Sequence, residues 1–259
     1  MKRLLSILAF TLAITAQAQW LPVLAGSPPA TGFTAFTAVF DGTNDYIGIT
    51  SAPTGLADGK QFTFSFWLKM GAGSDGASQY IQTTNSQRFA VLRTSANLIQ
   101  FIGLDSGGGT QYNLATTSTV TVASGWVHVY ACIDTTAAAA NTKIYLNGVS
   151  DTLTATLNNT ANVDAAGTLY RLGATSGATN KLNGALAEFW MNDVYFDDPT
   201  KFASGGVPIS LGTNGQTPTG SAPVVYFSLN GGGDSWAVDS SGNGNTLTVT
   251  GALGTTTPP

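Results

Sequence analysis

Apolar and polar residues alternate along several short runs of this chain. In QFTFSFWLKM (residues 61–70), Phe62, Phe64 and Phe66 share one parity and Trp67 has the other. The runs FDGTNDYIGI (40–49), GWVHVYACID (125–134) and KIYLNGV (143–149) follow a similar period of two. Because successive side chains of a strand point to opposite faces, this pattern predicts strands that each bury one face.

Further runs with strand character follow. RFAVLRT and LIQFIGL lie between residues 88 and 104, and other runs cover 168–172, 185–196 and 226–229. Charged residues make up 9% of the 259 and glycine contributes 31, which suits many strands joined by tight turns. Asp198 as N-cap and Pro199 at the first helical position predict one short helix near 198–204. The sequence therefore predicts an all-β, antiparallel two-sheet sandwich over residues 35–253 and a C-terminal tail, 254–259.

The first 18 residues have the pattern of a secretory signal peptide. Lys2 and Arg3 precede an apolar stretch, 4–15, and Ala16-Gln17-Ala18 forms a small-x-small cleavage site. The alternatives are a buried N-terminal strand or an uncleaved anchor. Residues 19–34 are rich in Pro, Gly, Ala and Thr and are interpreted as a linker or arm. We expect a secreted protein, extracellular or periplasmic, without a transmembrane segment.

The order and wording of the four alternating phrases resemble the laminin-G-like branch of the concanavalin A-like lectin/glucanase superfamily. The resemblance implies a jelly-roll sandwich. In that branch a phrase similar to DSSGNGNTLTVTG (239–251) precedes the FDG strand, whereas here it stands near the end. The simplest interpretation is a permuted order, in which the last two strands pair beside the Phe40 strand. The alternative is the beginning of a truncated second module.

The residue patterns that hydrolytic catalysis requires do not occur in this sequence. His128, the one histidine, lies between Val127 and Val129 in mid-strand and is interpreted as structural. The glucanases of the superfamily carry E-x-D-x-x-E on one strand, whereas this chain has a single glutamate, Glu188. On a regular strand Glu188 and Asp193 point to opposite faces. We predict that the protein is not an enzyme; a glycoside hydrolase built from distant carboxylates is the remaining alternative.

The net charge and the resemblance bear on two other kinds of partner, nucleic acid and calcium. The formal net charge of −4 and the lack of a basic stripe argue against nucleic-acid binding. Many members of the superfamily carry one structural calcium, which prefers carboxylate and amide oxygens. The candidate ligands here are Asp41, Asp45 and Glu188; for Asp41 and Asp45 the alternative is a turn-forming role.

Sugar binding typically combines an aromatic platform with polar partners. The candidate platforms are Trp67, Tyr112 and Trp190, with Arg88 and Asp105 as hydrogen-bonding partners; packing against a neighbouring strand is the alternative for each aromatic residue. We therefore expect a secreted, non-catalytic module that binds a carbohydrate or surface polymer. The segment PISLGTNGQTPTGSAPVVYF (208–227) looks like modules of phage surface proteins. The alternative is thus a structural or display protein of a phage particle or cell surface, associated with a larger assembly.

Overall fold

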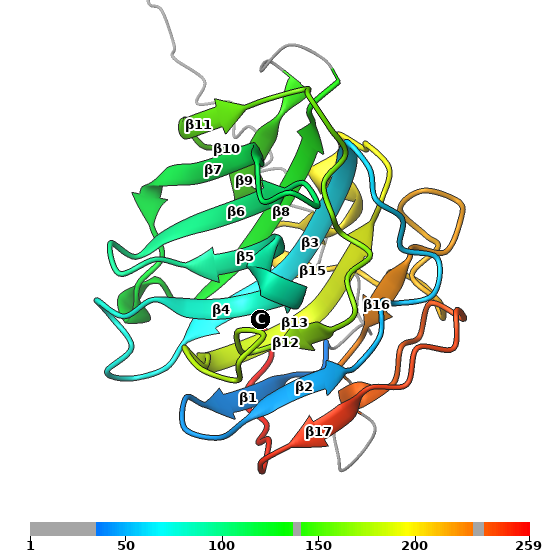
Figure 1. Ribbon diagram of the computed structural model, residues 1–259. Coiled ribbons are helices and arrows are strands. Elements are labelled where there is room, and N and C mark those ends of the chain that lie inside the picture. Colours follow the sequence, from blue (N-terminus) through cyan, green and yellow to red (C-terminus); the bar gives the residue numbers. More distant parts are fainter. Residues whose placement is uncertain (1–34, 137–140, 230–235) are drawn as a thin grey trace, which may run out of the picture. The chain divides into compact units, whose positions relative to one another are not determined.

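Two large antiparallel sheets lie face to face in the computed structural model, which describes residues 35–136, 141–229 and 236–259 (Figure 1). This arrangement confirms the predicted all-β sandwich. The predicted signal peptide (1–18) and the linker or arm (19–34) lie outside the described residues. In the described ranges, 35–136, 141–229 and 236–259, no helix is long and apolar enough to cross a membrane.

The first sheet, called sheet A, has the strand order β1-β13-β3-β8-β9-β10. β16 also pairs with β13, at residues 189–191, whereas β1 pairs with residues 183–186 of the same strand. Its strands are β1 (Ala38–Asp41), β3 (Gln61–Met70), β8 (Trp126–Asp134), β9 (Lys143–Leu146), β10 (Val149–Ser150), β13 (Asn183–Asn192) and β16 (Val225–Phe227).

The second sheet, called sheet B, has the order β11-β7-β6-β5-β4-β12-β2-β17. Its strands are β2 (Tyr46–Ile49), β4 (Gln79–Thr84), β5 (Phe89–Arg93), β6 (Leu98–Leu104), β7 (Thr110–Thr119), β11 (Leu153–Leu157), β12 (Tyr170–Leu172) and β17 (Thr248–Thr250). A small ladder, β14 (Ala203–Ser204) with β15 (Val207–Pro208), and three 3₁₀ turns, η1 (Asn85–Gln87), η2 (Val122–Ser124) and η4 (Pro199–Lys201), complete the described elements.

The core lies between the inner faces of the two sheets. Phe62 and Phe64 of β3 contact Phe89 of β5, with ring centroids 4.7 and 5.4 Å apart, and Phe64 also contacts Phe101 of β6 at 5.2 Å. All four rings are at most 1% exposed. Trp67 belongs to a different cluster on the outer face of sheet A, as the alternation predicts. Burying one face of each strand thus supplies the main apolar contribution to stability.

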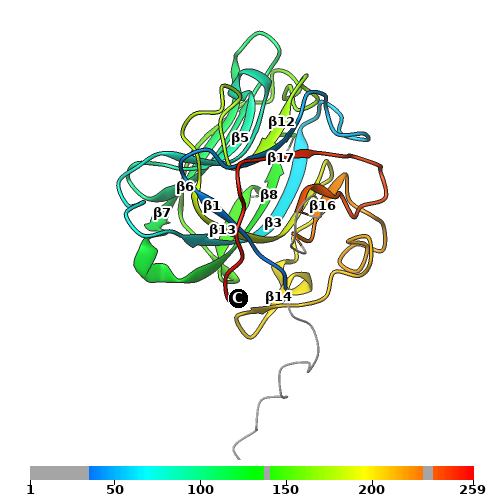
Figure 2. The same ribbon diagram turned by 90° about the horizontal axis from the view of Figure 1, so that it is seen from below.

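The C-terminal segment pairs with the beginning of the domain. β17 pairs antiparallel with β2, and Gly254 forms a bridge with Val39 of β1. Figure 2 shows the end of the chain running past β1. Thr37 Oγ1 both donates to the carbonyl of Thr256 and accepts from its N–H, each at 3.0 Å. The C-terminal strand therefore pairs with β2 near the beginning of the domain, whereas β16 pairs with β13 and not with the Phe40 strand β1, and the predicted tail is hydrogen-bonded to the domain.

A buried aspartate fixes this C-terminal phrase. Asp239 accepts from the N–H of Tyr226 (2.9 Å) and from Nδ2 of Asn245 (2.6 Å). Oδ1 of Asn245 in turn accepts from the N–H of Thr54 (2.6 Å). A buried carboxylate needs such donors to offset the loss of water. The DSSGNGN phrase thus ties β16 to the loop that follows β2.

The predicted helix near 198–204 is only a single 3₁₀ turn, η4. Asp198 caps it as predicted, since its side chain accepts from the N–H of Thr200 at 3.1 Å. Phe202 ends the turn because its ring packs onto the outer face of sheet A, 5.0 Å from Trp190, and Ala203 then enters β14. Tertiary packing therefore stops the helix after one turn.

Replacing Phe64 tests the position of the core. Phe64→Ala removes a ring that touches both sheets and leaves a cavity, so we expect the free energy of unfolding to fall by about 3–5 kcal/mol. Val149→Ala is the control, because Val149 is 71% exposed, and it should change stability by less than about 0.5 kcal/mol. Urea titrations of both variants measure these values; equal stability of Phe64→Ala and the parent would contradict this core.

Candidate functional site

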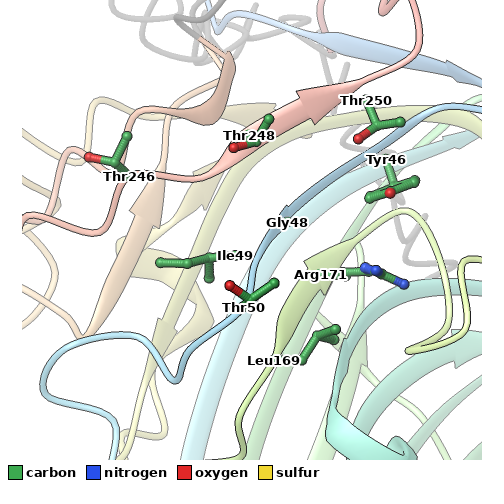
Figure 3. A pocket seen from close by; sticks show the side chains of 9 residues that line it. All are labelled: Tyr46, Gly48, Ile49, Thr50, Leu169, Arg171, Thr246, Thr248 and Thr250. Atoms are coloured by element: carbon green, nitrogen blue, oxygen red, sulfur yellow. The ribbon is translucent and has the colours of Figure 1, made fainter.

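A groove lies on the outer face of sheet B, where β2 runs between β12 and β17. Ile47 points into the core and is fully buried, so Tyr46, Gly48 and Thr50 point outward. Gly48 pairs with Arg171 of β12 on one side and with Thr248 of β17 on the other. The glycine has no side chain, and the result is a depression of about 240 Å³ over the three strands (Figure 3).

The depression depends on Gly48. A Cβ atom at this position would lie 2.9 Å from Cγ of Arg171, closer than unstrained carbon atoms approach. Thr248 and Thr250 of β17, and Thr246 just before this strand, present hydroxyls along the same rim. Glycine in a strand interior weakens the strand and commonly marks a place where another group approaches closely.

Tyr46 and Arg171 form the most defined pair in the groove. The guanidinium carbon lies 4.6 Å from the centre of the Tyr46 ring, within the range of a cation–π interaction. Nη1 of Arg171 donates to the carbonyl oxygens of Thr175 (3.1 Å) and Ser176 (2.5 Å). Both side chains are partly exposed. They supply an aromatic surface and a positive charge next to the open backbone of Gly48.

The structure places two of the predicted aromatic platforms in packed clusters. Tyr112 is fully buried in the core, where burial raises the pKa of its hydroxyl well above the usual value. Trp190 is also fully buried, on the outer face of sheet A, and its Nε1 donates to the carbonyl of Gly215 at 2.9 Å. For both residues the packing alternative holds, and neither ring has a face open to a ligand.

Trp67 points outward from sheet A, but the segment around β14 covers it and it is 2% exposed. It borders a cavity of about 180 Å³ together with His128. Nε2 of His128 lies 2.9 Å from Oγ of Ser65, and burial lowers the pKa of the imidazole to about 4. The histidine is therefore neutral at neutral pH and packs against Trp67, with ring centroids 5.0 Å apart. The ring of Trp67 is thus packed and offers no open face to a ligand.

The two predicted polar partners, Arg88 and Asp105, form local interactions with neighbouring residues. Arg88 forms an ion pair with Asp164 at 2.6 Å. Asp105 caps a turn by accepting from the N–H groups of Gly107 (2.8 Å) and Gly109 (2.9 Å), bonds that lower the pKa of its carboxyl. These residues lie on sheet B and its loops, whereas Trp67 and Trp190 lie on the outer face of sheet A. The five predicted ligand residues therefore do not form one site.

The three predicted calcium ligands do not converge either. Asp41 accepts from the N–H groups of Thr43 and Asn44, and Asp45 accepts from those of Asp41 and Ala252. Asp41 pairs with Asn183, five residues before Glu188, so Glu188 is roughly 17 Å away along β13 at about 3.4 Å per residue. Among the described residues no three His, Cys, Asp or Glu side chains are grouped to hold a metal. The turn-forming alternative describes Asp41 and Asp45.

Glu188 occupies an irregular position in β13. It lies in a β-bulge between Ala187 and Trp190, with φ at +49°. The side chain is 2% exposed and accepts a hydrogen bond from the hydroxyl of Tyr226 at 2.5 Å. Burial raises the pKa of this carboxyl from 4.5 to about 7.

The sequence patterns did not identify the residues of the β2 groove as a candidate binding site. Two features of the sequence could have indicated them. Tyr46, Gly48 and Thr50 share the outward parity of their strand, with a glycine in the middle, and residues 246–250 form a T-x-T-x-T repeat. Neither phrase reveals that the two strands are neighbours, since only the observed pairing of β2 with β12 and β17 joins them.

Comparisons with known proteins agree with the fold. A laminin-G family model of the concanavalin A-like lectin/glucanases superfamily matches residues 41–197. A candidate carbohydrate-binding protein from Bacteroides ovatus is similar in structure, with a TM-score of 0.59 and 15% identity over 87% of this chain and 61% of that chain. Domains LG4-5 of the mouse laminin α1 chain give a TM-score of 0.45 and 12% identity, over 70% of this chain and 48% of that chain. A comparison with curated proteins found no match.

The buried carboxyl of Glu188 makes stability depend on pH. Between pH 4.5 and about 7 the folded state keeps a proton that the unfolded state releases, so the free energy of unfolding falls as pH rises through this window. Across this pH window the free energy of unfolding falls by about 3 kcal/mol in total. Glu188→Gln keeps an acceptor for Tyr226 and has no charge. We expect it to be more stable than the parent at pH 8, by up to that amount, and equal at pH 4.

Urea unfolding of both proteins at pH 4, 6 and 8 measures this difference. His128, which burial also keeps uncharged, is present in both proteins and cancels in the comparison. Parallel pH profiles of the parent and Glu188→Gln would show that the carboxyl is ionised in the folded state.

Proposed function

Since the chain belongs to the concanavalin A-like lectin/glucanase superfamily, we propose that it is a non-catalytic carbohydrate-binding module whose binding site is the groove over β2. The observation that carries this proposal is the combination of Tyr46, Arg171 and threonine hydroxyls around the bare backbone of Gly48. The candidate carbohydrate-binding protein of similar fold supports the same class of ligand. This chain spans 61% of that protein, so any shared activity is part of the proposal.

The chemistry of the groove suits a sugar. A sugar ring has apolar C–H faces and hydroxyl groups around its edge, and protein sites meet these with aromatic rings and a few fixed polar groups. Tyr46 supplies the ring, while Arg171 and Thr248 supply donors on either side of Gly48. The cavity of about 240 Å³ is small, below the roughly 300 Å³ at which drug-sized pockets begin. We propose that it holds one sugar unit of a longer chain.

Two features support binding rather than hydrolysis. Glycosidases need two carboxyl groups on either side of the scissile bond, and no carboxylate lines this groove. Glu188, the one glutamate of the chain, is buried on the opposite sheet and hydrogen-bonded to Tyr226.

Export through residues 1–18 belongs to the proposal as well, because a surface polymer would be met outside the cell. N-terminal sequencing of the mature protein tests cleavage before Gln19.

Substitutions in the groove test its role in glycan binding. Gly48→Thr fills the depression and displaces Arg171, and Tyr46→Ala removes the aromatic surface. The backbone at Gly48 is outside the left-handed region, so a threonine fits the strand. We expect each variant to lower affinity at least tenfold, because a lost stacking or hydrogen-bonding surface costs more than about 1.4 kcal/mol.

The measurement begins with an array of neutral and acidic polysaccharides, followed by calorimetry with the tightest binder, in calcium and in EDTA. Asn113→Ala is the matched control, since Asn113 is exposed on the outer face of the same sheet, on β7. Groove variants that bind like the parent would place the site elsewhere. A parent protein that binds no polysaccharide on the array would refute the proposed function.

A further inference from the structure

The three arginines among the described residues differ in their partners. Arg88 forms an ion pair with Asp164 at 2.6 Å, and Arg93 lies 3.5 Å from Asp75. Arg171 forms no ion pair with any described residue, and no acidic residue lines its groove. Because a partly buried guanidinium is stabilised by an anion, an arginine left without one in a groove is placed to receive an anion from a ligand.

The guanidinium of Arg171 is held in one orientation. Nη1 donates to the carbonyl oxygens of Thr175 and Ser176, and the planar group lies over the ring of Tyr46. Nε and Nη2 donate to no group among the described residues. These two nitrogens form the edge with which arginine binds a carboxylate or sulfate through two parallel hydrogen bonds. A side chain fixed before binding loses less conformational entropy when the ligand arrives.

The register of the strands sets this edge beside the floor of the groove. Arg171 and Thr248 flank Gly48 on opposite sides, and Figure 3 shows both side chains beside β2. Neighbouring strands are about 4.8 Å apart, so the two side chains are roughly 10 Å apart across the glycine. A single sugar ring over Gly48 can therefore meet Arg171 with an acidic substituent and Thr248 with a hydroxyl.

We propose that the groove selects acidic glycans, and that Arg171 binds the carboxylate or sulfate group of one sugar unit. This inference rests on the proposed function and specifies its ligand. The formal net charge of the chain is −4, which disfavours a polyanion at long range. The selectivity therefore comes from the local guanidinium and not from the overall charge of the protein.

The experiment compares three polysaccharides by calorimetry in 0.15 M NaCl: polygalacturonate, which carries carboxylates, dextran sulfate, which carries sulfates, and neutral dextran. We expect at least one of the two acidic polymers to bind at least tenfold more tightly than dextran. The two acidic arms distinguish a uronate from a sulfate ester as the preferred group.

Variants then assign the preference to Arg171. Arg171→Gln should reduce affinity for the preferred acidic polymer at least tenfold. Arg171→Lys keeps the charge but loses the bidentate edge, so it should also weaken binding, with the thermal midpoint reporting that the fold is intact. Lys201→Gln is the control: it removes the same charge from an exposed position on η4, distant from the groove, and should bind like the parent.

The outcomes separate this inference from the proposed function. If dextran binds as tightly as both acidic polymers and Gly48→Thr abolishes all binding, acid selectivity is overturned and the glycan site stands. Equal losses in Arg171→Gln and Lys201→Gln would overturn it too, because binding would then follow general charge. If the parent binds none of the polysaccharides of this comparison or of the wider array, the proposed function itself fails.

Discussion

Burial of one face of every long strand is the constraint from which the rest of the structure follows. Phe62, Phe64 and Phe66 of β3 lie in the core, and their inward parity leaves Ser65 and Trp67 on the outer face of sheet A. The two sheets then differ in what covers their outer faces. On sheet A, Phe202 and Leu211 pack onto Trp190, which is fully buried. On sheet B, the outward positions of β2, β12 and β17 border an open groove.

The groove is assembled from three parts of the chain that are far apart in sequence. Tyr46 and Gly48 belong to the beginning of the domain, Arg171 to its middle and Thr248 to its end. The C-terminal strand takes its place because Asp45 accepts from the N–H of Ala252 at 2.9 Å and because Asp239 and Asn245 connect β16 to Thr54. The pairing of the C-terminal strand β17 with β2 therefore builds one wall of the proposed binding site.

Period-two patterning was sufficient for the sandwich and for the direction of most side chains. It separated Phe64, which lies in the core, from Trp67, which lies on the outer face of sheet A. It could not tell whether a second segment would cover an outward face. It therefore left two interpretations of Trp67 and Trp190, a ligand platform or a packed side chain, and in the structure Phe202, Ala203 of β14 and Leu211 pack over them.

Local patterns also could not reveal long-range pairing or irregular strand geometry. The parity count between Glu188 and Asp193 assumed a regular strand, whereas a bulge shifts the register at Glu188 and β13 ends at Asn192. Likewise, the polar alternation of 46–50 and 246–250 became a candidate site only through the pairing of β2 with β17. Register between distant strands is set by the packing of the whole domain rather than by either strand alone.

Amide chemical-shift mapping can show directly whether a sugar binds over β2. Uniformly ¹⁵N-labelled protein would be titrated with an oligosaccharide cut from its tightest-binding polysaccharide. We expect saturable shifts confined to the amides of β2, β12 and β17 and the 173–180 turn that carries Thr175. Shifts centred on Trp67 and His128, or no shifts at saturating ligand, would contradict binding in this groove.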